Sequence, residues 1–257
     1  MKQLLLSIIL ITASTISVGC QQTPTVPNTD GVTSGRPIIE APTASSPSPI
    51  AKVETTNSNF DESMYAFANP EITALIKQGK YKSGLEHYTK VGQSAKKPDG
   101  ESYESFFTGT SGNDTITAFG TGKHAHLIGV KFEIVSKPGV KIPLRPQSTG
   151  QGESDILIGT KEGVNEFILG SFITELSPKA EIFYVGKGDA DRALIQNFTK
   201  SRDSIMLAGD PKQYKFESAQ GNLRISTTAG DLVAIVEGVD KLTPGDISKE
   251  MGIFILK

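Results

Sequence analysis

The chain has 257 residues, with 26 Lys and Arg against 28 Asp and Glu, which gives a formal net charge of −2 at pH 7. This balance, without a dense basic block, excludes the electrostatic attraction that drives binding to a phosphate backbone, so we expect no nucleic-acid partner. The single cysteine excludes an internal disulfide, so an exported form of the chain must be stabilised by packing or by a bound metal ion.

Residues 1–20 have the layout of an export signal. Lys2 precedes an apolar run, Leu4–Ile11, which gives way to small residues. A permanent membrane-spanning helix needs about 20 apolar residues, and this run is much shorter. We therefore expect residues 1–20 to act as a signal peptide rather than as a transmembrane anchor.

The lone cysteine, Cys20, directly follows the small residues Ser17–Gly19. This arrangement resembles the lipobox of bacterial lipoproteins, with Ser17 where leucine is usual. The resemblance implies that Cys20 is acylated, becomes the new N-terminus and attaches the protein to a membrane. Gln21, in place of the aspartate that retains such proteins at the inner membrane, is compatible with the outer membrane or cell surface. The alternative is a free thiol within a cleaved signal.

Residues 21–58 form a segment rich in Pro, Thr and Ser that cannot build a core. We expect a disordered, partly extended tether that holds a folded domain away from the membrane. A proline-rich ligand for a partner domain is the alternative, but the repeated small polar residues favour a spacer. The prolines of this segment are Pro24, Pro27, Pro37, Pro42, Pro47 and Pro49.

Three short helical patterns follow within residues 59–100. The first lies in FDESMYAFA. In the second, NPEITALIKQG, Asn69 suits the position that caps a helix N-terminus and Pro70 suits the first helical position. The third opens at Ser83, where SGLE has the spacing of a capping box. These patterns predict a small module of three helices.

Residues 60–93 resemble a small helical module that recurs in secreted bacterial proteins, with a Phe-Asp start, an Asn-Pro-Glu helix and a SGLEHY ending. The resemblance implies a surface context and no particular activity. Glu86 and His87, within this stretch, are of residue types that form catalytic pairs. Because Glu86 already has a role in capping, we expect both to be structural.

From residue 101 the pattern changes to short strands separated by glycine and polar turns. Some runs, such as DILIG and SIMLA, are mostly apolar, whereas KFEIV and NLRIS alternate. The two kinds together indicate a sheet structure in which some strands are covered on both faces. Their close spacing predicts a mainly β domain over residues 101–257, built as a β-roll or β-solenoid.

Residues 109–117, GTSGNDTIT, fit the nine-residue calcium repeat G-G-x-G-x-D-x-U-x at every diagnostic position except the second glycine. The stretch resembles the RTX, or hemolysin-type, calcium-binding repeat. Ca²⁺ takes six to eight oxygen ligands, which glycine-rich turns and aspartates can supply. The resemblance implies ligands at Gly109, Ser111, Asn113 and Asp114.

Later turns retain part of the RTX pattern and lose part of it. His124 and Asn165 stand where the resemblance expects aspartate. Each replacement removes charge or an oxygen donor, so the expected Ca²⁺ binding is weak. The alternative is that the turn aspartates only bond backbone groups. The carboxylates retained at expected ligand positions are Asp155, Asp189, Asp191 and Asp203.

Two histidines, His124 and His126, alternate in a predicted strand, which would place both imidazoles on one face, as a zinc or copper site requires. A third ligand is not evident near them in the sequence. The chain also lacks an HExxH helix and a GxSxG elbow, so neither a zinc hydrolase nor a serine nucleophile is indicated.

These observations predict an exported, membrane-anchored lipoprotein of the cell envelope without enzymatic activity. Its β-rich domain is expected to bind Ca²⁺ weakly and to serve in binding or in surface structure. Two alternatives stay open, namely a secreted hydrolase whose site carries no motif and an envelope spacer that binds no ion. The expected segments are the signal of residues 1–20, the tether of 21–58, the helical module of 59–100 and the β-rich domain of 101–257.

Overall fold

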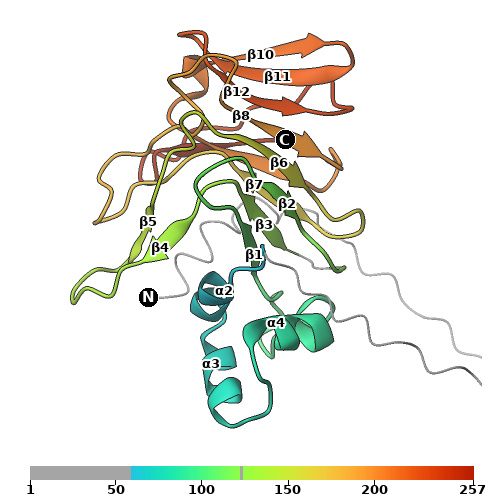
Figure 1. Cartoon of the computed structure of the whole chain (residues 1–257), viewed down its shortest axis with the longest axis vertical. Helices are drawn as coiled ribbons and strands as arrows, with labels where there is room; N and C mark the ends of the chain where they lie inside the picture. The colour runs from blue at the N-terminus through green and yellow to red at the C-terminus, as the bar shows by residue number, and fades with distance from the viewer. Residues whose placement is uncertain (1–58, 122–123) are drawn as a thin grey trace, which may run out of the picture. The chain divides into compact units, whose positions relative to one another are not determined.

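Two mainly parallel sheets, with a small hairpin and a group of short helices before them in the chain, make up the fold (Figure 1). The computed structural model describes residues 59–121 and 124–257. The expected signal peptide, acylated Cys20 and the tether of residues 21–58 lie outside the described residues. The expected fold class is confirmed, because the chain is mainly β, with a β-solenoid of about three turns and three helices.

The helical module begins where Asp61 caps its first helix. The Asp61 carboxylate accepts a hydrogen bond from the Met64 N–H at 2.9 Å, and the Ser83 hydroxyl accepts one from the Glu86 N–H at 3.0 Å. Asn69 stands at the expected cap position, but its side chain makes no capping bond there. The elements are α2 (Glu62–Ala68), α3 (Pro70–Lys77), α4 (Gly84–His87) and a π-helical turn, η1 (Tyr88–Gly92).

Each turn of the solenoid contributes one strand to each of two sheets. The first sheet has the order β1 (Ser105–Thr108), β3 (Ala125–Ile128), β7 (Asn165–Ile168), β9 (Ser204–Ala208) and β13 (Ile253–Leu256). The second has the order β10 (Tyr214–Ala219), β11 (Asn222–Thr227), β12 (Leu232–Val236), β8 (Arg192–Gln196), β6 (Ser154–Ile158) and β2 (Thr115–Thr117). A separate hairpin joins β4 (Phe132–Ile134) to β5 (Leu144–Pro146), and a short 3₁₀ turn, η2 (Pro211–Gln213), precedes β10.

The core consists of apolar side chains stacked in register from one turn to the next. Strands β1, β3, β7 and β9 pair in parallel, as do β2, β6, β8 and β12. Because side chains alternate between the faces of a strand, parallel pairing aligns one inward residue per turn. All members of the two resulting columns are fully buried: Phe107, Leu127, Phe167 and Ile205 in the first sheet, and Ile116, Leu157, Ile195 and Val236 in the second.

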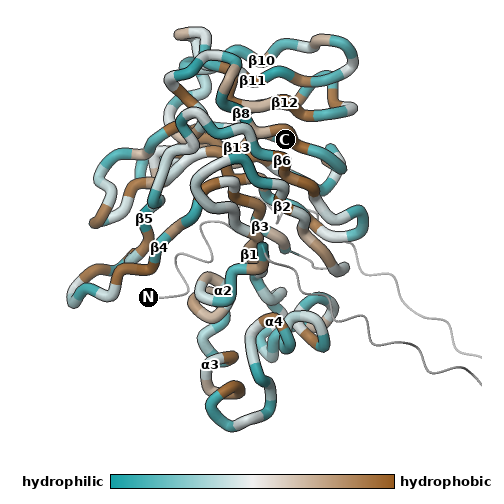
Figure 2. Tube along the Cα trace, in the orientation of Figure 1, coloured by the Kyte–Doolittle hydropathy of each residue, from teal (hydrophilic) through white to brown (hydrophobic). Residues whose placement is uncertain are grey.

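The two sheets differ in how their outer faces are covered. Every residue of β1, β3, β7 and β9 is buried, whereas burial alternates along β6 and β8. This confirms the expectation that some strands are covered on both faces. The hydropathy of the chain follows the same division, with hydrophobic stretches along β1 and β3 and a mostly hydrophilic β10–β11 hairpin (Figure 2).

Other elements cover both ends of the solenoid. Phe60 forms an antiparallel bridge with Phe107 on β1, and its ring stacks on Tyr88 at 5.3 Å between centroids. At the other end β13 runs antiparallel to β9, and the β10–β11 hairpin extends the second sheet beyond β12. Covering the terminal strands protects their unpaired backbone groups. None of the helices formed by the described residues has the length and apolar character that crossing a membrane requires.

Candidate metal centre

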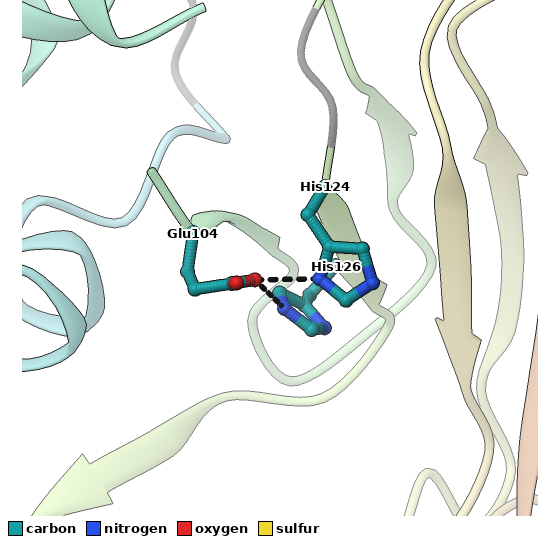
Figure 3. A group of neighbouring side chains, drawn as sticks. All are labelled: Glu104, His124 and His126. Carbon is teal, nitrogen blue, oxygen red and sulfur yellow. Dashed lines mark hydrogen bonds and ion pairs between the residues drawn. The ribbon is translucent and has the colours of Figure 1, made fainter. Parts of the chain in front are cut away.

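Three side chains meet at the start of β1 and β3, namely those of Glu104, His124 and His126 (Figure 3). Glu104 immediately precedes β1, and His124 immediately precedes β3. The two strands are parallel, with Phe106 opposite His126. Since residues two apart in a strand share a face, this register brings all three side chains to the same side of the sheet.

One carboxylate oxygen of Glu104 faces both imidazoles. Its Oε2 lies 2.5 Å from His124 Nδ1 and 2.8 Å from His126 Nε2. One ligand atom from each residue lies within 4.8 Å of the other two. The two imidazole rings are nearly perpendicular, at 85°, with centroids 4.8 Å apart. Two nitrogens and one oxygen therefore converge on a small volume, as the ligands of a metal ion do.

A second carboxylate stands on the far side of His126. Glu166, on β7, is the cross-strand partner of His126, and its Oε2 lies 3.0 Å from His126 Nδ1. The two atoms are at ion-pair distance but lack the alignment of a hydrogen bond, and neither atom has another hydrogen-bond partner. Each ring nitrogen of His126 therefore faces a different glutamate.

The centre is buried, and the pKa values of Glu104 and His126 are shifted by the charged groups around them. Glu104 and Glu166 are each 2% exposed and His126 is fully buried, with Phe106 stacked on its ring at 4.5 Å. Burial opposes ionisation of Glu104, but its contacts with His124 and His126 outweigh that effect and lower its pKa to about 2. Burial likewise opposes protonation of His126, but Glu104 and Glu166 outweigh it and raise its pKa to about 9.

Glu104 is held in place by the helical module. The Asn69 side-chain amide donates to the Glu104 carbonyl oxygen at 2.8 Å, and its Oδ1 accepts from the Glu104 N–H at 3.3 Å. The same amide group donates to the Tyr65 carbonyl oxygen, within α2, at 2.8 Å. Asn69 is fully buried. The backbone of a ligand residue is thus fixed by a side chain from the junction of α2 and α3.

The sequence correctly placed His124 and His126 on one face of a strand and did not identify Glu104, the third residue of the candidate group. Glu104 lies 20 positions before His124, so proximity along the chain gives no sign of it. The signal that could have found it is the β1–β3 register, because a solenoid turn places residue 104 beside residue 124.

The expected calcium residues of the first turn bond neighbouring backbone instead of converging on one point. Asp114 Oδ2 accepts from the Thr110 N–H at 2.7 Å and from its hydroxyl at 3.0 Å. Asn113 Oδ1 accepts from the Ser154 N–H of the next turn at 2.7 Å. Ser111 is exposed, and a side chain at Gly109 would collide with the Gly129 carbonyl oxygen, so close backbone approach explains that glycine.

Most of the expected calcium carboxylates in the later turns also accept hydrogen bonds from neighbouring protein groups. Asp155 is fully buried, and its two oxygens accept from the Asp114 N–H at 2.8 Å and the Tyr184 hydroxyl at 2.6 Å. Asp203 accepts from the N–H groups of Asn165 and Thr199 at 2.9 and 2.8 Å. These contacts join consecutive turns, which is the structural role that the sequence left open.

The last two expected calcium residues differ from each other. Asp189 is exposed and pairs with Arg224 at 3.2 Å. Asp191 is fully buried, and its Oδ2 accepts from the Gly152 N–H at 3.2 Å while its Oδ1 has no partner. None of the expected calcium residues belongs to the three-ligand group of Glu104, His124 and His126.

Glu86 and His87 have separate partners, as expected for structural residues. Only the Ser83 half of the expected capping box forms, because Glu86 accepts from the Lys82 N–H at 2.5 Å rather than from the Ser83 N–H. Glu86 also pairs with Lys90 at 2.6 Å. His87 is buried, with its Nδ1 2.8 Å from the Tyr65 hydroxyl.

No family model matches the chain, and no curated protein matches its sequence. The resemblances to lipoproteins and to RTX repeats thus remain expectations that come from the residues alone.

Proposed function

We propose that this protein is a non-enzymatic envelope lipoprotein whose β-solenoid domain binds a divalent metal ion at Glu104, His124 and His126. The observation that supports this most directly is the convergence of one carboxylate oxygen and two imidazole nitrogens in a buried part of the sheet. Histidine and carboxylate together are ligands of many divalent ions. The sequence of residues 1–58 supports the envelope location through the lipobox resemblance at Cys20 and the tether.

The burial of the centre favours binding over catalysis. Glu104 and His126 are almost inaccessible, and His124 keeps only 15% of its side-chain surface exposed. A catalytic metal needs a position that a substrate can reach. A metal held here would instead tie the start of β1 to the start of β3, which is a stabilising role.

Weak Ca²⁺ binding, implied by the RTX resemblance, is the second candidate, and Asp191 is the residue that favours it. Its buried Oδ1 lacks a partner, and a buried carboxylate oxygen without one is costly unless a cation or water compensates it. The hydrogen bonds of Asp155 and Asp203 support a structural role for the other turns. A solenoid that binds no ion is the remaining alternative.

The test is calorimetric titration of the purified full chain, after treatment with a chelator, with Zn²⁺, Mg²⁺ and Ca²⁺ in separate experiments. We expect one divalent ion to bind with a stoichiometry of one and to raise the melting temperature, because a ligand of the folded state stabilises it. Binding should be lost in His124→Ala. His87→Gln is the matched control, since it removes the histidine outside the centre. If no divalent ion binds, the spacer alternative holds.

A further inference from the structure

We infer that the Glu104, His124 and His126 centre selects an ion of the zinc class over Ca²⁺, and that Glu166 is the positioning residue that makes His126 bind through Nε2. This inference rests on the proposed metal binding and adds to it the class of ion and the role of a fourth residue.

The ligand atoms themselves favour zinc-class chemistry. Ca²⁺ takes about 6–8 oxygen ligands, whereas the centre presents two imidazole nitrogens and one oxygen of Glu104. Zn²⁺ binds two imidazoles and a carboxylate in tetrahedral geometry with water in the fourth position, and bonds of about 2.0–2.2 Å place the ligand atoms roughly 3.3 Å apart. Two of the contacts in the centre, at 2.5 and 2.8 Å, are shorter than that spacing. Side-chain rotations that move these ligand atoms apart by up to about 1 Å would admit the ion.

The position of Glu166 decides which nitrogen of His126 is available. Nε2 faces Glu104 at 2.8 Å and Nδ1 faces Glu166 at 3.0 Å. A neutral imidazole carries its proton on one nitrogen and a lone pair on the other. In this structure Nε2 is hydrogen-bonded to Glu104 Oε2, whereas Nδ1 and Glu166 Oε2 are at ion-pair distance. When Glu104 Oε2 turns to the ion, a small realignment of the ring places the Nδ1 proton toward Glu166 and leaves the Nε2 lone pair for the ion. Histidine ligands in proteins commonly have such a carboxylate partner, which fixes both tautomer and orientation.

The charges of the buried carboxyl groups also favour a bound divalent ion. Glu104 and Glu166 are both almost fully buried carboxyl groups, and an isolated buried carboxylate is strongly unfavourable. One divalent ion beside two neutral histidines offsets two carboxylates. Glu166 Oε2 has no hydrogen-bond partner, so its contact with His126 is the one available to it within the described residues. The location of Glu166 on β7, opposite His126 on β3, follows from the turn-to-turn register.

The first experiment measures ion class on the chelator-treated full chain. Zn²⁺ affinity is determined by competition with a chromophoric chelator, and Ca²⁺ is then added in excess. We expect Zn²⁺ to bind and Ca²⁺ not to displace it. Displacement of Zn²⁺ by the excess Ca²⁺ would overturn the inference while leaving divalent binding intact. Failure of every divalent ion to bind would overturn both.

The second experiment tests Glu166. Glu166→Gln should weaken Zn²⁺ binding by about 10–100-fold, the usual effect of losing such a partner, and should change the visible spectrum of the Co²⁺-substituted protein. Glu162→Gln, on an exposed loop three residues before β7, is the matched control for the lost charge. Equal affinity and an identical spectrum in Glu166→Gln and wild type would refute the positioning role.

A third measurement needs no variant and applies if Glu166→Gln does not fold. Nitrogen NMR of the histidine rings in the zinc-loaded wild type reports which nitrogen carries the proton. We expect His126 to be protonated at Nδ1 and bound through Nε2. The opposite tautomer would refute the assignment of Glu166.

Discussion

Asn69 holds both backbone polar groups of Glu104 and so links the helical module to the candidate metal centre. Its amide donates to the Glu104 carbonyl oxygen at 2.8 Å and its Oδ1 accepts from the Glu104 N–H at 3.3 Å. The Glu104 side chain in turn contacts His124 and His126 on the next turn of the solenoid. The candidate metal centre and the junction of α2 and α3 therefore share one residue.

Asn69→Ala should reduce both stability and metal affinity. The substitution removes the side-chain partners of the N–H and carbonyl oxygen of Glu104, and each unsatisfied buried group costs about 1–3 kcal/mol. Urea unfolding of the chelator-treated protein measures the first effect, and Zn²⁺ titration of the same variant measures the second.

The half-buried Asn222 provides a comparison, because its Oδ1 accepts from a backbone N–H, that of Gly238, far from the centre. Asn222→Ala should lower stability less and leave Zn²⁺ affinity unchanged. If a folded Asn69→Ala protein bound Zn²⁺ with wild-type affinity, the hydrogen bonds from Asn69 would not be what positions Glu104.

Without metal, the charged network should stabilise the fold most between about pH 4.5 and 6.5. The folded pKa of His126 is raised from 6.5 to about 9, so its contribution is complete below pH 6.5 and is lost as the pH rises through 9. The folded pKa of Glu104 is lowered from 4.5 to about 2, so its contribution is complete above pH 4.5 and is lost as the pH falls through 2.

The measurement is the difference in unfolding free energy between wild type and His126→Gln across this pH range, with chelator present. The groups that face His126 are Glu104, Glu166 and His124. We expect the difference to shrink steadily from pH 6.5 to 9. A difference that stays constant over that interval would contradict the charged state assigned to His126.

Asp203→Ala should destabilise the solenoid whether or not Ca²⁺ is present. Its carboxylate accepts from the N–H groups of Asn165 and Thr199, so its removal leaves buried donors unpaired, at about 2 kcal/mol or more. Melting curves with chelator and at millimolar Ca²⁺ distinguish this role from ligation, because extracellular calcium modules bind at about 10⁻⁴–10⁻³ M. If Asp203→Ala lowered the melting temperature only in the presence of Ca²⁺, Asp203 would instead be a calcium ligand. The exposed Asp189→Ala is the control.

Cys20→Ser should release the protein from membranes. Acyl chains on Cys20 would provide the attachment, and a short apolar signal cannot replace them. Membrane fractionation and mass spectrometry of the N-terminal peptide measure the two consequences. Membrane association of the variant at wild-type levels would contradict lipid anchoring through this residue.

The sequence by itself determined the class of fold and the local features of the chain. Short strands with inward apolar residues and intervening glycine turns indicated a solenoid, because each turn must bury one side of each strand against its neighbours. Ser83 was identified as a helix cap from its spacing to Glu86. His124 and His126 were placed on one face because strand alternation is a local property of the backbone.

The tertiary structure decided which distant residues meet. Glu104 and Glu166 reach His126 because parallel strands from successive turns are aligned in register, and that alignment depends on packing of the whole core. For the same reason, the sequence could not show that Asp155 bonds the backbone of the preceding turn or that Asn69 holds Glu104. Strand periodicity fixes the face that a side chain occupies, whereas register, set by non-local packing, fixes its neighbours.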